Sequence, residues 1–194
     1  MDSLIKVLLF KSAFREENFE EYCEKDQTEG RKMVKPKIML FPELFKKEAE
    51  ERARSYLEKW RGCAQQIVGL FQTLLGIEDE LVFKGMRYLG GGVAGTGHTC
   101  GSLIGGVFVL SMRYGLDIPS DRSKPKEPGE EIATELVKWF EAEFGTTECR
   151  AITKVDLLDP VAYKAWRESG GNEICMNLIG KTAKKVAELI IEHG

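Results

Sequence analysis

The sequence predicts an all-α fold: a single-domain helical bundle of about six to eight helices, packed around a buried central helix at about residues 100–114. Three observations predict it. Apolar residues recur three and four positions apart in most segments after residue 41. Glycine, proline, asparagine or aspartate stands where many of these segments begin or end. No stretch alternates apolar and polar residues convincingly enough for a strand.

The composition excludes several classes of protein. Hydrophobic residues make up 43% and charged residues 30% of the 194 residues, the balance of a globular domain with its own core. The net charge of −3 gives no basic surface for nucleic acid, and no apolar run reaches the roughly 18 residues of a membrane span. The first ten residues lack a basic region and a cleavage site, so we expect no signal peptide and a cytoplasmic protein.

The first helices follow from local signals. Residues 1–40 are predicted to form an N-terminal appendage, a short helix and a charged linker carrying Cys23, and residues 41–194 the four-cysteine helical domain. The first helix of this domain covers 42–60, with a proline where its missing N–H costs nothing. The second covers 63–75 and ends at Gly76. The third covers 78–89 and has an acidic first turn.

The central helix follows a glycine-rich loop. It covers about 100–114 and carries almost no charge before Arg113, so it should be buried. Residues 116–129 contain three prolines and are expected to form a surface loop. Later helices cover 130–144, a short segment from about 147, 160–168 and 173–192. Asp159 and Pro160 begin the 160–168 helix as cap and first residue.

Eight glycines stand between residues 90 and 106. Glycine allows close approach of the backbone, so we expect some of them to line a cofactor: Gly90, Gly91, Gly92, Gly97 and Gly101. Residues 90–95 also spell the glycine pattern of dinucleotide-binding loops. The pattern follows a predicted helix rather than a strand, so we do not expect nucleotide binding.

Four of the five cysteines stand near predicted helix starts: Cys63, Cys100, Cys149 and Cys175. A helix start offers unpaired N–H groups and partial positive charge, which favour the thiolate that binds metals and attacks disulfides. We therefore hypothesise that four helix starts gather four thiols in one pocket. The alternative is that each cysteine is only a small buried hydrophobic residue.

Several chemistries are open to such a pocket. Four thiolates can hold an iron–sulfur cluster, with [2Fe–2S] favoured, for electron transfer, and zinc takes the same ligands in structural sites. Alternatively, a cysteine pair exchanges with disulfides and His98 relays a proton, unless His98 is simply an exposed loop residue. The chain lacks Cys-x-x-Cys-His, so c-type haem is not expected. If the protein is an enzyme, these residues make it an oxidoreductase.

The cysteines and their neighbours resemble the C_GCAxxG_C_C family of redox-active proteins. The family is named for four cysteines, and the second lies in an element of cysteine, glycine, alanine, two variable residues and glycine. Here that element is residues 100–105, with Ser102 in place of alanine, and the resemblance covers about residues 44–190. The other three cysteines of the pattern are Cys63, Cys149 and Cys175.

This resemblance has functional implications. The family is similar to the non-haem part of split-Soret cytochromes, which are dimeric and carry an iron–sulfur centre as well as haem. The similarity implies electron transfer by the four cysteines without haem, a redox partner protein and a homodimer.

Overall fold

The computed structural model describes residues 41–59, 61–116 and 127–194. These residues form eight α-helices and one short 3₁₀ helix, and they contain no strand, which confirms the all-α prediction. None of these described helices combines the length and apolar character needed to span a bilayer. The predicted appendage at 1–40, with Cys23, and most of the predicted loop at 116–129 lie outside the described residues.

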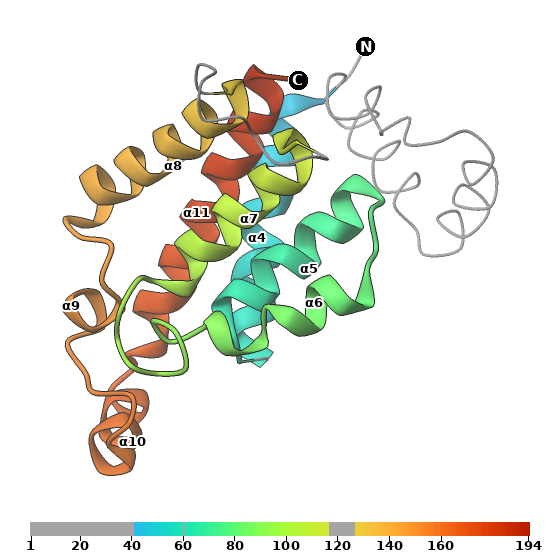
Figure 1. Ribbon diagram of the computed structural model, residues 1–194. Coiled ribbons are helices and arrows are strands. Elements are labelled where there is room, and N and C mark those ends of the chain that lie inside the picture. Colours follow the sequence, from blue (N-terminus) through green and yellow to red (C-terminus); the bar gives the residue numbers. More distant parts are fainter. Residues whose placement is uncertain (1–40, 60, 117–126) are drawn as a thin grey trace. The chain divides into compact units, whose positions relative to one another are not determined.

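Five longer helices form the bundle, and shorter elements connect them (Figure 1). The longer helices are α4 (Pro42–Lys59), α5 (Cys63–Leu75), α7 (Gly101–Tyr114), α8 (Pro128–Phe144) and α11 (Asn172–Glu192). The shorter elements are α6 (Glu80–Gly85), η1 (Arg87–Leu89), α9 (Cys149–Thr153) and α10 (Pro160–Glu168).

The prediction of one helix at 78–89 is wrong. Asp79 caps α6 by accepting a hydrogen bond from the Val82 N–H at 3.0 Å, so the helix begins late. It ends after Gly85, a residue that weakens helices, and the chain continues as the 3₁₀ turn η1. The break between α6 and η1 turns the backbone back toward the start of α5. The glycine-rich loop begins there, at Gly90.

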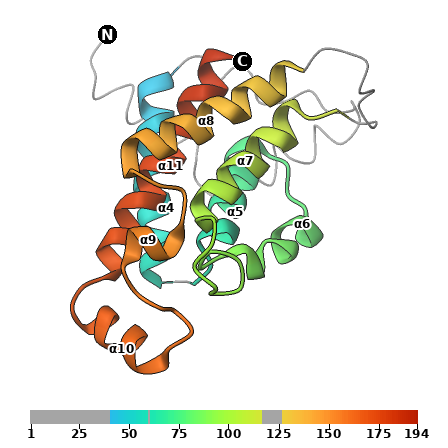
Figure 2. The ribbon, with the colours of Figure 1, turned by 60° about the vertical axis from the view of Figure 1, so that its left-hand side comes forward.

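The centre of the bundle is shared by α7 and α11. Helix α7 packs against α5, α8 and α11, and α11 lies along α4 over most of its length, as Figures 1 and 2 both show. Large side chains that are almost completely buried come from α5, α7, α8 and α11: Ile67, Leu70, Phe71, Leu110, Leu136, Phe140, Ile179 and Leu189. Their burial is the main stabilising term of the fold.

Two glycines allow the neighbouring helices to approach α7 closely. A Cβ at Gly105 would lie 2.8 Å from the Ala64 carbonyl oxygen on α5. A Cβ at Gly106 would lie 2.9 Å from Leu136 Cδ2 on α8 and 3.1 Å from Val186 Cγ2 on α11. The small residues expected in the central helix therefore determine how near α5, α8 and α11 lie to it.

Candidate functional site

The glycine-rich loop between η1 and α7 is a compact, left-handed turn. Positive φ angles occur at six of its residues: Gly91, Gly92, Val93, Ala94, Gly95 and Gly97. The loop is closed by its own backbone, because the Gly97 N–H donates to Gly91 O at 3.1 Å and the His98 N–H donates to Gly92 O at 3.0 Å. The loop is therefore stabilised by hydrogen bonds between its own backbone groups.

Three backbone hydrogen bonds join this loop to the start of α9. The Cys100 N–H donates to Thr147 O at 2.8 Å, the Cys149 N–H to His98 O at 2.7 Å, and the Arg150 N–H to Gly97 O at 2.9 Å. Between them, Thr99 and Glu148 form the one isolated bridge found in the described residues. This junction holds Cys100 beside Cys149, although 48 positions of chain lie between them.

The third cysteine enters the site from α5. Cys63 is the first residue of that helix, and a Cβ at Gly101 would lie only 2.5 Å from Cys63 Sγ. A Cβ at Gly90 would lie 3.4 Å from the Cys63 backbone nitrogen. Gly90 and Gly101 are therefore the predicted cofactor-lining glycines that lie against a site cysteine.

The four thiols interact with one another. All four are free, and Cys175, the fourth residue of α11, completes the group. Charge on Cys63, Cys149 and Cys175 raises the pKa of Cys100, charge on Cys63 raises that of Cys149, and charge on Cys63 and Cys149 raises that of Cys175. Every pair of the four is thus within electrostatic reach.

Burial makes three of these thiols weaker acids than ordinary cysteine. It is the largest cause in each case and raises the pKa of Cys100 well above 9.0, that of Cys149 to about 11 and that of Cys175 to about 12. The expectation that helix starts favour the thiolate is therefore wrong for these three residues, because loss of water and mutual repulsion outweigh the helix ends.

Hydrogen-bond donors near the sulfurs oppose this effect. The backbone N–H of Ser102 at the start of α7 lowers the pKa of the Cys100 thiol. The Thr153 hydroxyl has the same influence on the pKa of Cys149. That hydroxyl has one proton, which it donates to the Cys149 carbonyl oxygen at 2.9 Å, so it must rotate to bond the sulfur instead.

The site is closed on one side and opens toward the surface on the other. Cys100 and Cys149 are each only 5% exposed, whereas Cys63 and Cys175 are half-buried. An exchange of electrons or ligands with the surroundings would therefore pass Cys63 and Cys175.

The other predicted residues lie around this group. His98 is exposed, and no side-chain hydrogen bond links it to a thiol in the described residues, so the relay role stays a prediction. Gly91, Gly92 and Gly97 shape the loop: a Cβ at these positions would meet Leu157, the His98 backbone and Arg150, respectively. The dinucleotide pattern follows η1, a helical turn, so the strand expected of such loops is missing in this described segment.

Sequence reasoning missed two hydroxyl residues beside the thiols, Ser102 and Thr153. Thr153 stands four residues after Cys149 on one helical turn, a spacing that could have identified it. Ser102 stands two residues after Cys100, and its Oγ is buried without a hydrogen-bond partner among the described residues. A buried hydroxyl without a partner is the kind of group that a bound ion or cluster satisfies.

The donor set suits an iron–sulfur cluster in its chemistry. Such clusters take four cysteine sulfurs, and hydrogen bonds to sulfur and exposure to solvent tune them. Here two of the four thiols are buried and two are half-buried, and the Ser102 N–H acts on Cys100. Among the described residues, no three His, Cys, Asp or Glu side chains are placed to hold one metal ion in common.

A comparison with protein families gives one match. The family described as "Putative redox-active protein (C_GCAxxG_C_C)" matches residues 62–189, a span that includes the glycine-rich loop and all four site cysteines. No curated protein matches the chain. No solved structure matches it either.

Proposed function

Because the chain belongs to the C_GCAxxG_C_C family of redox-active proteins, we propose that its four cysteines hold an iron–sulfur centre, of the [2Fe–2S] type, for electron transfer. The observation that carries this proposal is the mutual interaction of four free thiols drawn from four separate segments.

The chain's own residues would each have a defined part. Cys63, Cys100, Cys149 and Cys175 provide the thiolates, and their protons leave as the site is loaded. The Ser102 N–H stabilises negative charge on the Cys100 sulfur. When bound, the centre supplies a one-electron couple, and the half-buried sides at Cys63 and Cys175 provide the route to a redox partner protein.

The raised pKa values make Cys100, Cys149 and Cys175 poor attacking thiols for disulfide exchange. At neutral pH burial holds Cys100, Cys149 and Cys175 as thiols, and the thiol is a poor nucleophile. Metal ions remove this obstacle because they bind the thiolate directly and displace its proton. A structural zinc site and a disulfide pair are the other outcomes that the following test can reveal.

The test is the visible spectrum of protein purified without oxygen. We expect a brown protein whose absorbance disappears in Cys100→Ser and persists in Cys23→Ser, the matched change at the fifth cysteine. A colourless wild-type protein with zinc would indicate a structural site. A colourless protein that loses two free thiols on oxidation would indicate disulfide chemistry.

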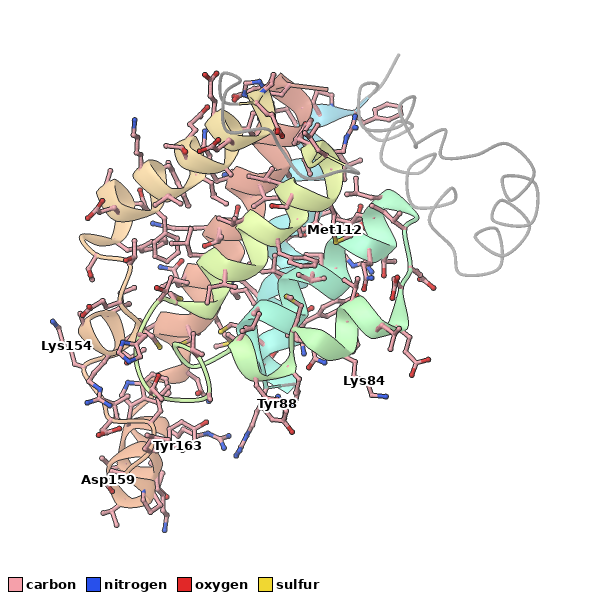
Figure 3. The ribbon with its side chains drawn as sticks, viewed as in Figure 1. Lys84, Tyr88, Met112, Lys154, Asp159 and Tyr163 are labelled. Atoms are coloured by element: carbon pink, nitrogen blue, oxygen red, sulfur yellow. The ribbon has the colours of Figure 1, made fainter. Side chains whose placement is uncertain are left out.

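We also propose that the protein acts as a homodimer in the cytoplasm. Tyr88, Leu158 and Val161 are large apolar side chains with 77%, 60% and 77% of their surface exposed, and they belong to the segments around the glycine-rich loop and α10. Figure 3 shows Tyr88 at that end of the bundle. We take these three side chains to form one exposed apolar patch, and such patches are typical of contact surfaces. Light scattering should give twice the chain mass of 21.9 kDa, and a monomer would contradict the proposal.

A further inference from the structure

Three exposed arginines lie around the half-buried thiol at the start of α5. Arg61 stands two residues before Cys63 in the sequence. Arg87 lies against the residue between them, because a Cβ at Gly62 would be 3.1 Å from Arg87 Nη1. Arg167 comes from α10, and its guanidinium contacts the same aromatic ring as that of Arg61. Arg61, Arg87 and Arg167 together form the arginine cluster.

The shared ring belongs to Tyr163 of α10. The guanidinium carbons of Arg61 and Arg167 lie 5.8 and 5.9 Å from its centre. The same ring stacks on Trp166, with the two ring centres 6.0 Å apart. Because an aromatic ring attracts cations, it holds these two positive side chains near each other. Side chains that are already held in place lose less freedom when a partner binds.

The arginine cluster lies at the end of the bundle that holds the thiols. Helix α10 and the glycine-rich loop are at the same end in Figures 1 and 2, and Figure 3 shows Tyr163 there. The segment before α10 packs on the loop, since a Cβ at Gly91 would lie 3.2 Å from Leu157 Cδ1. A protein bound to the cluster would therefore lie beside Cys63, on the side where the site opens.

The positive charges of the cluster are not neutralised within the part of the chain that the structure describes. None of its three arginines forms an ion pair there, although acidic residues flank α10 on both sides. Asp156 pairs with Arg150 instead. Glu173 pairs with Arg54. The cluster therefore presents three positive charges to the solvent, although the whole chain has a net charge of −3.

These charges do not suit a second copy of the chain as the occupant. In a two-fold dimer the same patch of each copy meets around the axis, so the arginines would face arginines. Like charges across an interface weaken binding, whereas carboxylates opposite the arginines strengthen it. The dimer contact proposed above uses apolar side chains and does not need these charges. The cluster therefore favours a different protein, with acidic residues at its contact surface.

We propose that the arginine cluster and Tyr163 form the docking surface for an acidic electron-carrier protein, whose carboxylates bind the three guanidinium groups beside Cys63. The inference rests on the proposed function for the partner's role as an electron carrier, whereas the binding itself needs no centre at the thiols. A guanidinium binds a carboxylate through two parallel hydrogen bonds, so arginine supplies orientation as well as charge. Positive charge on the surface also steers a negative partner and speeds its association.

The test measures the association rate of the metal-free protein with flavodoxin, a small flavin-containing electron carrier with an acidic surface. The variant changes Arg61, Arg87 and Arg167 to glutamine together. At about 0.01 M salt we expect it to associate about tenfold more slowly than the wild type, because the steering charge is lost. Between about 0.01 M and about 0.15 M salt the wild-type rate should fall, since salt screens the attraction.

The matched control removes the same charge elsewhere. It changes three exposed lysines of α4, α8 and α11 to glutamine together: Lys47, Lys138 and Lys184. The control should associate at nearly the wild-type rate, because its changes lie outside the arginine cluster. Circular dichroism should show the same helix content in all three proteins, since every substituted side chain is exposed.

Several results would overturn the inference. Equal slowing of both variants would mean that only net charge matters, and a wild type that ignores salt or does not bind flavodoxin would contradict the docking surface directly. Tighter binding of a single-stranded oligonucleotide than of flavodoxin would assign the surface to nucleic acid. A changed molecular mass of the arginine variant would place the cluster between copies. Wild-type protein that lacks iron and sulfide but binds flavodoxin through the cluster would remove only the iron–sulfur proposal.

Discussion

The weak acidity of the buried thiols has a consequence for the stability of the metal-free protein. Cys149 and Cys175 have pKa values of about 11 and 12 when folded, against an ordinary 9.0. As the pH rises above 9, the unfolded chain loses these protons first, so the stability they provide below pH 9 is lost on the way to pH 12. At pH 10 we expect the free energy of unfolding to be lower by roughly 1 kcal/mol for each thiol. One pKa unit corresponds to about 1.4 kcal/mol, and screening by solvent reduces this contribution.

Urea unfolding of the metal-free protein at pH 8 and pH 10 measures this effect. The control is a variant with Cys149 and Cys175 both changed to alanine, whose stability should fall less over the same interval. Equal losses in the two proteins would show that other groups cause the pH dependence.

Gly101 is the residue whose side chain the site tolerates least. Its Cβ would lie 2.5 Å from Cys63 Sγ and 2.8 Å from Leu89 O. We expect Gly101→Ala to push Cys63 out of the group, to abolish loading with iron and to cost about 1–3 kcal/mol by overpacking. Gly85→Ala is the matched control, because a Cβ there meets nothing within 4 Å, and it should load normally. A wild-type iron content in Gly101→Ala would show that iron binding does not depend on the present position of Cys63.

At the scale of elements, the site depends on the junction between the glycine-rich loop and α9. Gly97 has φ +84, and its Cβ would lie 2.7 Å from Arg150 Cβ. Gly97→Ala should therefore separate residues 97–100 from 147–150 and reduce iron content. Gly145→Ala has the same kind of strain, with φ +77, but its Cβ meets nothing within 4 Å.

Both alanine variants introduce left-handed strain of about 1–2 kcal/mol. The iron content per folded chain distinguishes the effect of backbone strain, which both variants share, from that of the contact with Arg150, which only Gly97→Ala makes. We expect the content to fall in Gly97→Ala and to stay near the wild-type value in Gly145→Ala. Equal contents in the two variants would mean that the junction does not position the cysteines.

The elements also show which signals in the sequence were sufficient. The helix at 63–75 and its end at Gly76 are confirmed, because its apolar period and the left-handed glycine are local features. Asp159 and Pro160 likewise begin α10 as predicted. The junction between 97–100 and 147–150 could not be predicted, because its partners are far apart in the sequence and pair through backbone atoms that carry no residue signature.

For the whole molecule, most of the large core side chains lie outside the site, although Cys100 and Cys149 are buried as well. The most deeply buried side chains, such as Phe71, Phe140 and Leu189, belong to the packed helices and not to the loop junction. Removal of the centre should therefore leave the helix content nearly unchanged and lower the melting temperature, because a bound group stabilises only the folded state. Circular dichroism before and after chelation under reducing conditions measures both. A large loss of helix would show that the centre organises the bundle itself.

Residue types and helix starts led to the four-cysteine hypothesis, but they predicted the wrong acidity for three of the thiols. The charge at a helix end is a local property, whereas burial depends on which helices pack together, and the second effect is larger here. Ser102 was missed for the same reason: only the packed structure shows that its hydroxyl is buried and has no hydrogen-bond partner among the described residues.

The proposed function requires that four cysteines from four segments bind one iron–sulfur centre. Its most direct test is the iron and acid-labile sulfide content of protein prepared without oxygen. We expect about two irons and two sulfides per chain, the composition of a [2Fe–2S] cluster. A folded protein with four reactive thiols in its site and neither iron nor sulfide, even after reconstitution with both, would contradict it.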